Sequence, residues 1–255
     1  MEHPAIVIVA YNRPESLKRL LESVRRAVYA VNNISLIISI DFQGSKTNEE
    51  VVSLSESFRW PWGTKRVIRH TKNLGLKEHI LQCGDLCVEY ESIILLEDDL
   101  VVAPAFYNFA IQAATYYKND SSIAGISLYA YEFEELGLFR FYPESKGKCT
   151  FFMQWAASWG QVWTKNQWEG FRKWYSENQG LDNINVPDSV KNWGNSWKKF
   201  FISYLVERDK FFVYPYVSYT TLIDDIGTHI KGDAKVNNVL LSSEDYIGSL
   251  NFSDS

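Results

Sequence analysis

Short apolar runs alternate with amphipathic stretches along the first hundred residues, and each run ends at polar residues. The runs rich in branched apolar side chains span residues 5–10, 36–40, 66–69 and 92–96. Such short runs predict strands, and those without polar alternation predict strands buried on both faces. Between them lie apolar residues at helical spacing, as at Leu17, Leu20 and Leu21. This alternation predicts an α/β fold with a mostly parallel central sheet and right-handed crossovers.

The starts of the helices are marked less clearly than the strands. Asn12, with Glu15 three residues later, has the spacing of a capping box for a first helix. A further helix is expected over residues 77–89, and Pro104 suits the first turn of another that carries Phe106 and Phe109.

Polar residues follow each of the four predicted strands. They are Asn12 and Arg13, Asp41, His70, and the acidic triplet Glu97, Asp98 and Asp99. The carboxyl ends of parallel strands meet at one edge of a sheet, where open α/β proteins bind ligands. The four strand ends together indicate a binding crevice, although any one of these residues alone would more often be a turn residue.

The acidic triplet is the clearest chemical signal. Three adjacent carboxylates repel one another, and a buried one without a partner is unfavourable, so a divalent cation would stabilise them. Hard oxygen ligands suit Mg²⁺ or Mn²⁺, ions that keep positions for substrate phosphates. A solvated acidic turn that caps the next helix is the alternative, but the buried strand before the triplet favours a metal–phosphate site. The chain has no glycine-rich phosphate loop of either common type.

The second half of the chain is dominated by aromatic residues. Strands are expected at 123–127 and 211–215, helices at 167–174 and 196–207, and a hairpin or long loop over 129–142. Seven of the nine tryptophans fall between Trp155 and Trp197. They would serve either as walls of an acceptor-sugar site or as ordinary core packing. From Lys231 the chain is polar, and we expect the last dozen residues to be poorly ordered.

Composition narrows the class of protein. With 255 residues and 46% apolar residues, the chain is long enough for a sizeable core. A net charge of −5 argues against a general nucleic-acid binder. Three cysteines without zinc-type spacing fit a reducing compartment. With no signal peptide and no run long enough to span a membrane, we expect a cytoplasmic protein.

These motifs resemble a known family. Ala10-Tyr11-Asn12-Arg13, Asp41 and the stretch from Glu97 to Phe106 look like a GT-A-fold glycosyltransferase of the N-acetylglucosaminyltransferase I type, together with family-2-like bacterial sugar transferases. The resemblance implies a single GT-A domain over residues 1–255. Its nucleotide-sugar-binding half would cover about 1–104, its acceptor half 105–235, and a polar tail 242–255.

The resemblance also implies a site. The donor would be a UDP-sugar held with Mn²⁺ or Mg²⁺, with Asp99 as the direct metal ligand and His229 as a residue that contacts the metal or the diphosphate. The residues that would contact the donor are Ala10, Tyr11, Arg13, Asp41, His70, Asn73, Glu97, Asp98, Ser158 and Trp159. A loop over residues 224–233 would close over the donor.

One feature departs from the family. The inverting enzymes place an aspartate on or just before the helix that here begins at residues 195–198, and none of these four residues is a carboxylate. A general base must lie within hydrogen-bond reach of the acceptor hydroxyl. Asp188 and Asp225 are the substitutes we predict, and loss of activity or a different mechanism is the alternative.

The function expected from the resemblance is transfer of GlcNAc or another hexose, with inversion, to a glycan or lipid-linked acceptor in bacterial surface polysaccharide synthesis. A lipid-linked acceptor would bring peripheral contact with the inner face of the plasma membrane. Two other classes stay open: a nucleotidyltransferase that makes a sugar nucleotide, and a non-catalytic sugar-binding protein on the same fold.

Overall fold

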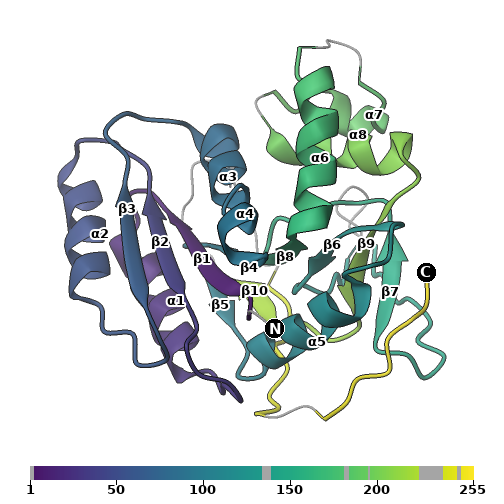
Figure 1. The fold of residues 1–255 in the computed structure, drawn as a ribbon, viewed down its shortest axis with the longest axis horizontal. Helices are drawn as coiled ribbons and strands as arrows, with labels where there is room; N and C mark the ends of the chain where they lie inside the picture. Colours follow the sequence, from purple (N-terminus) through teal and green to yellow (C-terminus); the bar gives the residue numbers. More distant parts are fainter. Residues whose placement is uncertain (1–2, 134–138, 181–183, 195, 224–237, 246–247) are drawn as a thin grey trace.

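A mixed β-sheet flanked by helices on both faces forms the centre of the protein (Figure 1). The computed structural model describes residues 3–133, 139–180, 184–194, 196–223, 238–245 and 248–255. Within these residues, eight strands form one sheet in the order β3-β2-β1-β4-β8-β6-β9-β7, and β10 pairs with β5 in a second, two-stranded sheet.

The strands fall into a parallel part and a mixed part. The parallel strands β1 to β4 span Ala5–Ala10, Leu36–Ile40, Lys65–Arg69 and Ser92–Glu97. The others are β5 (Leu100–Val102), β6 (Ile123–Ser127), β7 (Thr150–Met153), β8 (Gln161–Thr164), β9 (Phe211–Pro215) and β10 (Thr220–Leu222). Because β8 pairs antiparallel with both β4 and β6, it joins the two parts into one sheet.

The helices form two layers. Contacts join α1 to α2, and Tyr29 just after α1 to Phe106 and Tyr107 of α5, on one side of the sheet. Contacts among α3, α4, α6 and α8 form the layer on the other side (Figure 1). The helices are α1 (Pro14–Arg26), α2 (Lys46–Ser57), α3 (Leu76–Gly84), α4 (Cys87–Tyr90), α5 (Phe106–Tyr117), α6 (Lys165–Asn178), α7 (Asp188–Lys191) and α8 (Trp197–Glu207).

This architecture confirms the predicted α/β fold with its mostly parallel central sheet, and it corrects two details. The helix expected over residues 77–89 is two helices, α3 and α4, separated at Asp85 and Leu86. Asn12 is not the N-cap of α1: Arg13 holds that position without a side-chain cap, and the Asn12 amide donates to Gln43 instead. Pro14 at the first position of α1 sets the start of the helix without that cap.

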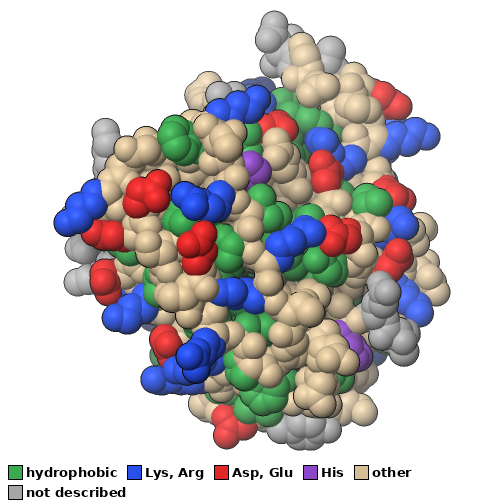
Figure 2. Space-filling model, turned by 60° about the vertical axis from the view of Figure 1, so that its left-hand side comes forward, with side chains coloured by type: hydrophobic (Ala, Val, Ile, Leu, Met, Phe, Trp, Pro, Cys, Tyr) green, Lys and Arg blue, Asp and Glu red, His purple; other side chains and the backbone are tan. Residues whose placement is uncertain are grey.

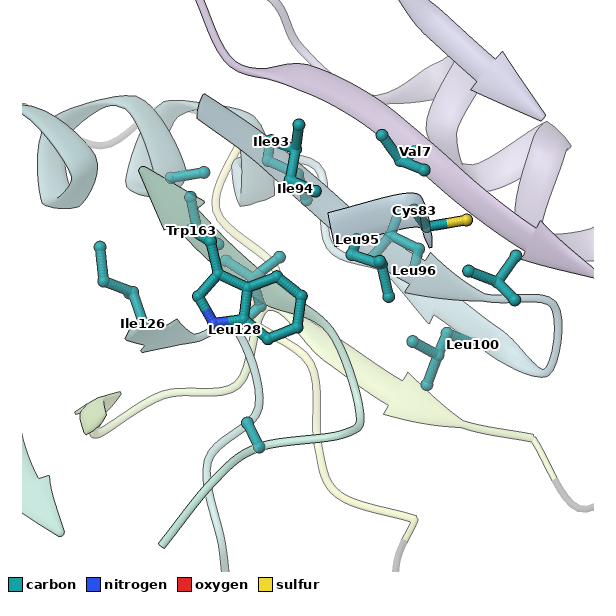
Figure 3. Packing of buried hydrophobic residues seen from close by; sticks show 14 of the residues in the cluster. Val7, Cys83, Ile93, Ile94, Leu95, Leu96, Leu100, Ile126, Leu128 and Trp163 are labelled. Carbon is teal, nitrogen blue, oxygen red and sulfur yellow. The ribbon is translucent and has the colours of Figure 1, made fainter. Parts of the chain in front are cut away.

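The core is continuous across both parts of the sheet. Figure 3 shows the β4 side chains Ile93 to Leu96 lying between Val7 of β1 and Trp163 of β8. Trp163 is fully buried and contacts Trp168, Trp197 and Phe201, so strand β8 is fixed against α6 and α8. This packing holds the carboxyl end of β4 in a defined position.

The end of the chain differs from the poorly ordered tail that we expected. Phe252 is buried against Phe109, Tyr116 and Tyr117 of α5. The Cys149 backbone N–H donates to the Asn251 carbonyl, which ties the last residues to the start of β7. Phe252 supplies an apolar contact with the core, which the mostly polar composition of this segment did not indicate.

Acidic and basic side chains are interspersed over the face shown in Figure 2, with no large area of one sign. Among the described residues, no helix combines the length and apolar character that crossing a membrane requires.

Candidate active site

The carboxyl ends of the four adjacent parallel strands bring together most of the polar residues that the sequence indicated. The order β3-β2-β1-β4 places the residues after β1 next to those after β4. Arg13, which follows β1, lies against Asp98 and Asp99, which follow β4. Tyr11 contacts Asn73 through its hydroxyl, with 3.1 Å between Asn73 Nδ2 and Tyr11 Oη. The shared edge predicted from the strand ends is therefore present.

Arg13 is the cation at the centre of this edge. One of its guanidinium nitrogens donates to Asp98 Oδ1, and Nη1 donates to Asp99 Oδ2 at 3.0 Å. The Tyr11 backbone N–H donates to Asp98 Oδ2 at 3.3 Å. Asp98 is almost completely buried, whereas the Asp99 side chain keeps 17% of its surface exposed. Asp98 therefore holds the Arg13 side chain in place, and Asp99 is the carboxylate that a ligand would reach.

The pKa values of two carboxyl groups of the triplet are raised well above their ordinary values. Burial, with repulsion from Asp99 and Asp98, raises the pKa of Glu97 to about 8. Burial also raises the pKa of Asp98 to about 6, although the Arg13 charge opposes that shift. The positive charges of Arg13 and Lys198 lower the pKa of Glu97, but by less than burial and repulsion raise it. The cluster is therefore short of positive charge.

Asp41 anchors the segment that follows β3. Its carboxylate accepts backbone hydrogen bonds from Phe42 and Leu74 at 2.8 Å and from Gly75 at 3.0 Å. The backbone N–H of Asp41 donates in turn to the carbonyl of Ala10, the last residue of β1. Asp41 is buried, and much of its hydrogen-bonding capacity is used by the chain itself. Its predicted contact with a nucleotide stays a prediction.

A row of three side chains beside Asp41 was not found by the sequence analysis as a unit. Ser39 Oγ lies 3.2 Å from His70 Nε2 and 2.8 Å from His79 Nε2, and the two imidazole rings meet edge to face. A serine hydroxyl can donate one hydrogen bond and accept two, so it can bond to both imidazoles at once. The signal in the sequence was a serine inside an otherwise apolar buried strand.

The loop before β8 carries Ser158 and Trp159, two of the predicted donor contacts. The Trp159 carbonyl accepts a hydrogen bond from Thr220 Oγ1 at 2.6 Å, and its ring packs against Tyr129. Ser158, the preceding residue, is half-buried. Trp159 is also half-buried, so its ring contributes both to packing and to the surface.

Of the two predicted bases, only Asp188 is among the described residues, and none of its described contacts joins it to the acidic cluster. Asp188 begins α7, its side chain is 92% exposed, and it pairs with Lys191 at 2.5 Å. Asp225 and His229 lie outside the described residues, as does the loop 224–233. The backbone N–H of Ile223, the residue before that loop, donates to the Asp99 carbonyl at 3.0 Å. Ile223, the last described residue before this loop, therefore lies beside Asp99.

The donor set at this edge fits a divalent cation. In the part of the chain that the structure describes, no three acidic, histidine or cysteine side chains converge on one point. The three carboxylates nevertheless supply hard oxygen atoms, and the raised pKa values of Glu97 and Asp98 show that more positive charge would stabilise them. Asp99 is the partly exposed member of the cluster, and its predicted role as a metal ligand stays a prediction.

Comparison with known proteins identifies the class. The profile of glycosyl transferase family 2 matches residues 5–190, most of the chain, and the protein belongs to this family. No curated protein gives a significant match.

Solved structures of a glycosyltransferase-type fold resemble the chain over most of its length. The crystal structure of S. aureus TarS 1-349 has 14% sequence identity, a TM-score of 0.50, and coverage of 85% of this chain and 59% of that one. The structure of TarS 1-349 in complex with UDP-GlcNAc has 12% identity and a TM-score of 0.52, with 88% and 60% covered. The chain thus spans about six tenths of these structures, and at this identity the likeness shows the GT-A fold alone.

Proposed function

We propose that the protein is a metal-dependent inverting glycosyltransferase that moves GlcNAc or another hexose from a UDP-sugar to a hydroxyl of a glycan or lipid-linked acceptor. The observation that carries this proposal is Arg13 bridging Asp98 and Asp99 where four parallel strands end. Membership of glycosyl transferase family 2 supports the reaction class. TarS has been solved with UDP and with UDP-GlcNAc, and the stretch from Glu97 to Phe106 resembles a GlcNAc transferase, so UDP-GlcNAc is the first donor to test.

Each residue at the edge has a proposed role. Ala10, Tyr11, Arg13, Asp41, His70 and Asn73 bind the nucleotide, and Glu97, Asp98, Ser158 and Trp159 bind the sugar and ribose. We assign residues 1–104 to the donor and 105–235 to the acceptor within one domain. The protein acts in the cytoplasm, in peripheral contact with the membrane when the acceptor is lipid-linked.

Asp99 holds Mn²⁺ or Mg²⁺ in this proposal, with His229 as the second candidate ligand. When bound, the ion offsets negative charge on the diphosphate. Asp98 holds Arg13 in position for the diphosphate in this proposal, since Asp98 is buried and pairs with the guanidinium.

The reaction is a single displacement. The acceptor oxygen forms a bond to the anomeric carbon, the bond from that carbon to the diphosphate oxygen breaks, and UDP leaves with the bonding electrons. The acceptor proton passes to a general base, for which Asp188 and Asp225 are the candidates. The exposed position of Asp188 means that it would act only if the acceptor brings its hydroxyl to α7.

Substitution of Asp99 tests the donor site. We expect Asp99→Asn to lower metal-dependent donor hydrolysis or transfer by about 10²-fold or more, the scale seen when one electrostatic contact to a transition state is removed. The melting temperature should stay within a few degrees, because the substitution removes one of three mutually repelling acids. Thermal shift and hydrolysis with a panel of UDP-sugars, with and without Mn²⁺, measure both effects.

The exposed Asp245→Asn variant is the matched control and should behave as wild type. An Asp99→Asn protein with normal activity would contradict the assignment of Asp99 as the metal ligand. Stabilisation by a UDP-sugar without cleavage or transfer would favour the non-catalytic alternative, which the absence of a carboxylate from the sequence at residues 195–198 supports. Release of pyrophosphate would favour a nucleotidyltransferase.

A further inference from the structure

A pocket lined by aromatic side chains lies in the second half of the molecule, outside the acidic cluster. It is formed by residues 130–132, 141–143, 215–218 and 240–242, together with Phe151. Its volume is about 410 Å³, within the range of roughly 300–1,000 Å³ that is typical of small-molecule sites. The pocket is therefore large enough for a ligand.

Five aromatic residues supply most of the apolar wall of this pocket. The ring centroid of Phe151 lies 5.9 Å from that of Phe141 and 5.0 Å from that of Tyr216, so these inner rings hold one another in place. Tyr142 and Leu240, which also line the pocket, are 72% and 86% exposed. Large apolar side chains exposed together around a hollow are typical of a binding surface.

One carboxylate lies among these apolar side chains. Glu132 is the only acidic or basic residue among the described residues that line the pocket. The Leu240 backbone N–H donates to Glu132 Oε1 at 3.3 Å. Since a carboxylate accepts several hydrogen bonds, Glu132 can also accept from hydroxyl groups of a ligand. Arg140, beside the pocket, donates to the Tyr142 hydroxyl at 2.7 Å, so a positive charge near the rim offsets the charge of Glu132.

Two contacts connect the pocket to the candidate active site. Tyr131 lines the pocket, and its ring centroid is 5.7 Å from that of Trp159, which we assign to the sugar. Ser218 also lines the pocket, five residues before Ile223, whose backbone N–H donates to the Asp99 carbonyl. Five residues of chain span at most roughly 18 Å. The pocket is thus close to Asp99, although Asp99 is not part of its lining.

The combination of aromatic rings with a carboxylate favours a saccharide as the ligand. A pyranose ring has an apolar face that packs against aromatic rings, and its hydroxyl groups donate to a carboxylate. A lipid chain or an apolar protein segment would bury Glu132 without supplying a donor, which is unfavourable. Because the nearby charges of Glu132 and Arg140 offset each other, an uncharged sugar fits better than an ionised one.

We propose that this pocket binds an uncharged sugar unit of the acceptor, a unit other than the one that receives the transferred sugar. The acceptor is then an oligosaccharide or a longer glycan and not a single sugar. This inference rests on the proposed function, because it makes the bound saccharide the acceptor. It also extends the acceptor region beyond residue 235, since residues 240–242 belong to the lining.

Direct binding of uncharged saccharides to the whole chain tests the pocket without any transfer reaction. The probes are the methyl glycosides of glucose, galactose, mannose and N-acetylglucosamine, and the disaccharides cellobiose, lactose and N,N′-diacetylchitobiose. Titrations followed by ligand-observed NMR give the dissociation constants. We expect at least one probe to bind to the wild type, and Tyr142→Ala to weaken its binding by about fivefold, because the variant removes one aromatic ring from the pocket.

Two further variants locate the binding within the pocket. Glu132→Gln should also weaken it, because a neutral amide is a poorer acceptor than a carboxylate, while its oxygen can still accept from Leu240. Phe139→Ala is the matched control: Phe139 is 76% exposed and close to Phe141 in sequence, but it does not line the pocket. Its loss should leave binding unchanged. Circular dichroism checks that each variant is folded.

Failure of every probe to bind to the wild type would overturn the proposal. So would unchanged binding to folded Tyr142→Ala and Glu132→Gln variants, since the sugar would then lie elsewhere. An equal loss in Phe139→Ala and Tyr142→Ala would also contradict it, because a general apolar surface and not the pocket would be responsible.

UDP binding, measured separately by thermal shift, decides the donor assignment independently. A protein that binds UDP but none of the saccharides lacks this subsite and keeps the proposed function. Saccharide binding that depends on Tyr142, without UDP binding, would leave a sugar-binding pocket and remove the glycosyltransferase assignment.

Discussion

His79 is a buried imidazole that contacts Ser39 and the ring of His70. It lies 2.8 Å from Ser39 Oγ, and Asp41 and His70 are the charged and titratable groups that act on it. Because Ser39 Oγ lies within hydrogen-bond distance of both imidazoles, the three side chains form one connected row. This row therefore couples a buried residue to one of the predicted nucleotide contacts.

Burial lowers the pKa of His79 to about 4, against the ordinary histidine pKa of 6.5. The folded protein then binds fewer protons than the unfolded chain between these pH values. We expect the His79 contribution to stability to be complete above pH 6.5 and to be lost as the pH falls to 4, by up to about 3 kcal/mol. Urea unfolding across this pH range measures the loss.

A His79→Gln variant provides the comparison, because glutamine can bond to Ser39 but does not titrate. Its free energy of unfolding should fall less steeply than that of the wild type between pH 6.5 and 4. Parallel curves for the two proteins would show that His79 is not responsible for the acid sensitivity.

At the scale of elements, the contact between α3 and α6 depends on a glycine. A Cβ at Gly84, the last residue of α3, would overlap the indole of Trp168. Trp168 is buried, and its Nε1 donates to Asp85 Oδ1 at 2.8 Å, so the ring has little freedom to move aside. The end of α3 therefore packs directly against Trp168 of α6, and the chain continues from there into α4 and β4.

We expect Gly84→Ala to destabilise the protein by about 1–3 kcal/mol, because overpacking outweighs the better helix propensity of alanine. Gly180→Ala is the control, since nothing lies within 4 Å of a Cβ there. Chemical denaturation of both variants gives the difference. If Gly84→Ala were as stable as the wild type, the α3–α6 junction would have room that the structure does not show.

At the scale of the whole molecule, the proposed donor region (1–104) and the proposed acceptor region (105–235) share one sheet. Strand β8 comes from the second half of the chain but lies between β4 and β6, with the buried Trp163 in the core of both regions. The last residues also return to α5 through Phe252. The two regions therefore have no separate cores.

We expect the protein to unfold in one cooperative transition. Seven of the nine tryptophans lie in residues 155–197, so tryptophan fluorescence follows mainly the second half of the chain, whereas far-ultraviolet circular dichroism follows the helices of both halves. The two probes should give the same urea midpoint. Separated midpoints would mean that the regions fold independently and that the single-domain assignment is wrong.

The sequence alone determined the four parallel strands of the first half and the residues at their ends, but not the short strand β5. Apolar runs such as Ile6 to Val9 must be buried, and strands separated by helices must run parallel, so Arg13 and Asp99 were expected at one edge from pattern alone. The role of Asp188 as a general base and the roles of the donor-binding residues stay predictions.

Only the tertiary structure decided which side chains meet. It showed that Asp41 anchors residues 74 and 75, that Ser39 joins two histidines, and that three tryptophans enclose Lys198. These contacts join residues far apart in the chain. Hydrophobic periodicity reports only which face of its own element a residue occupies, so long-range contacts of polar groups require the packed fold to be known.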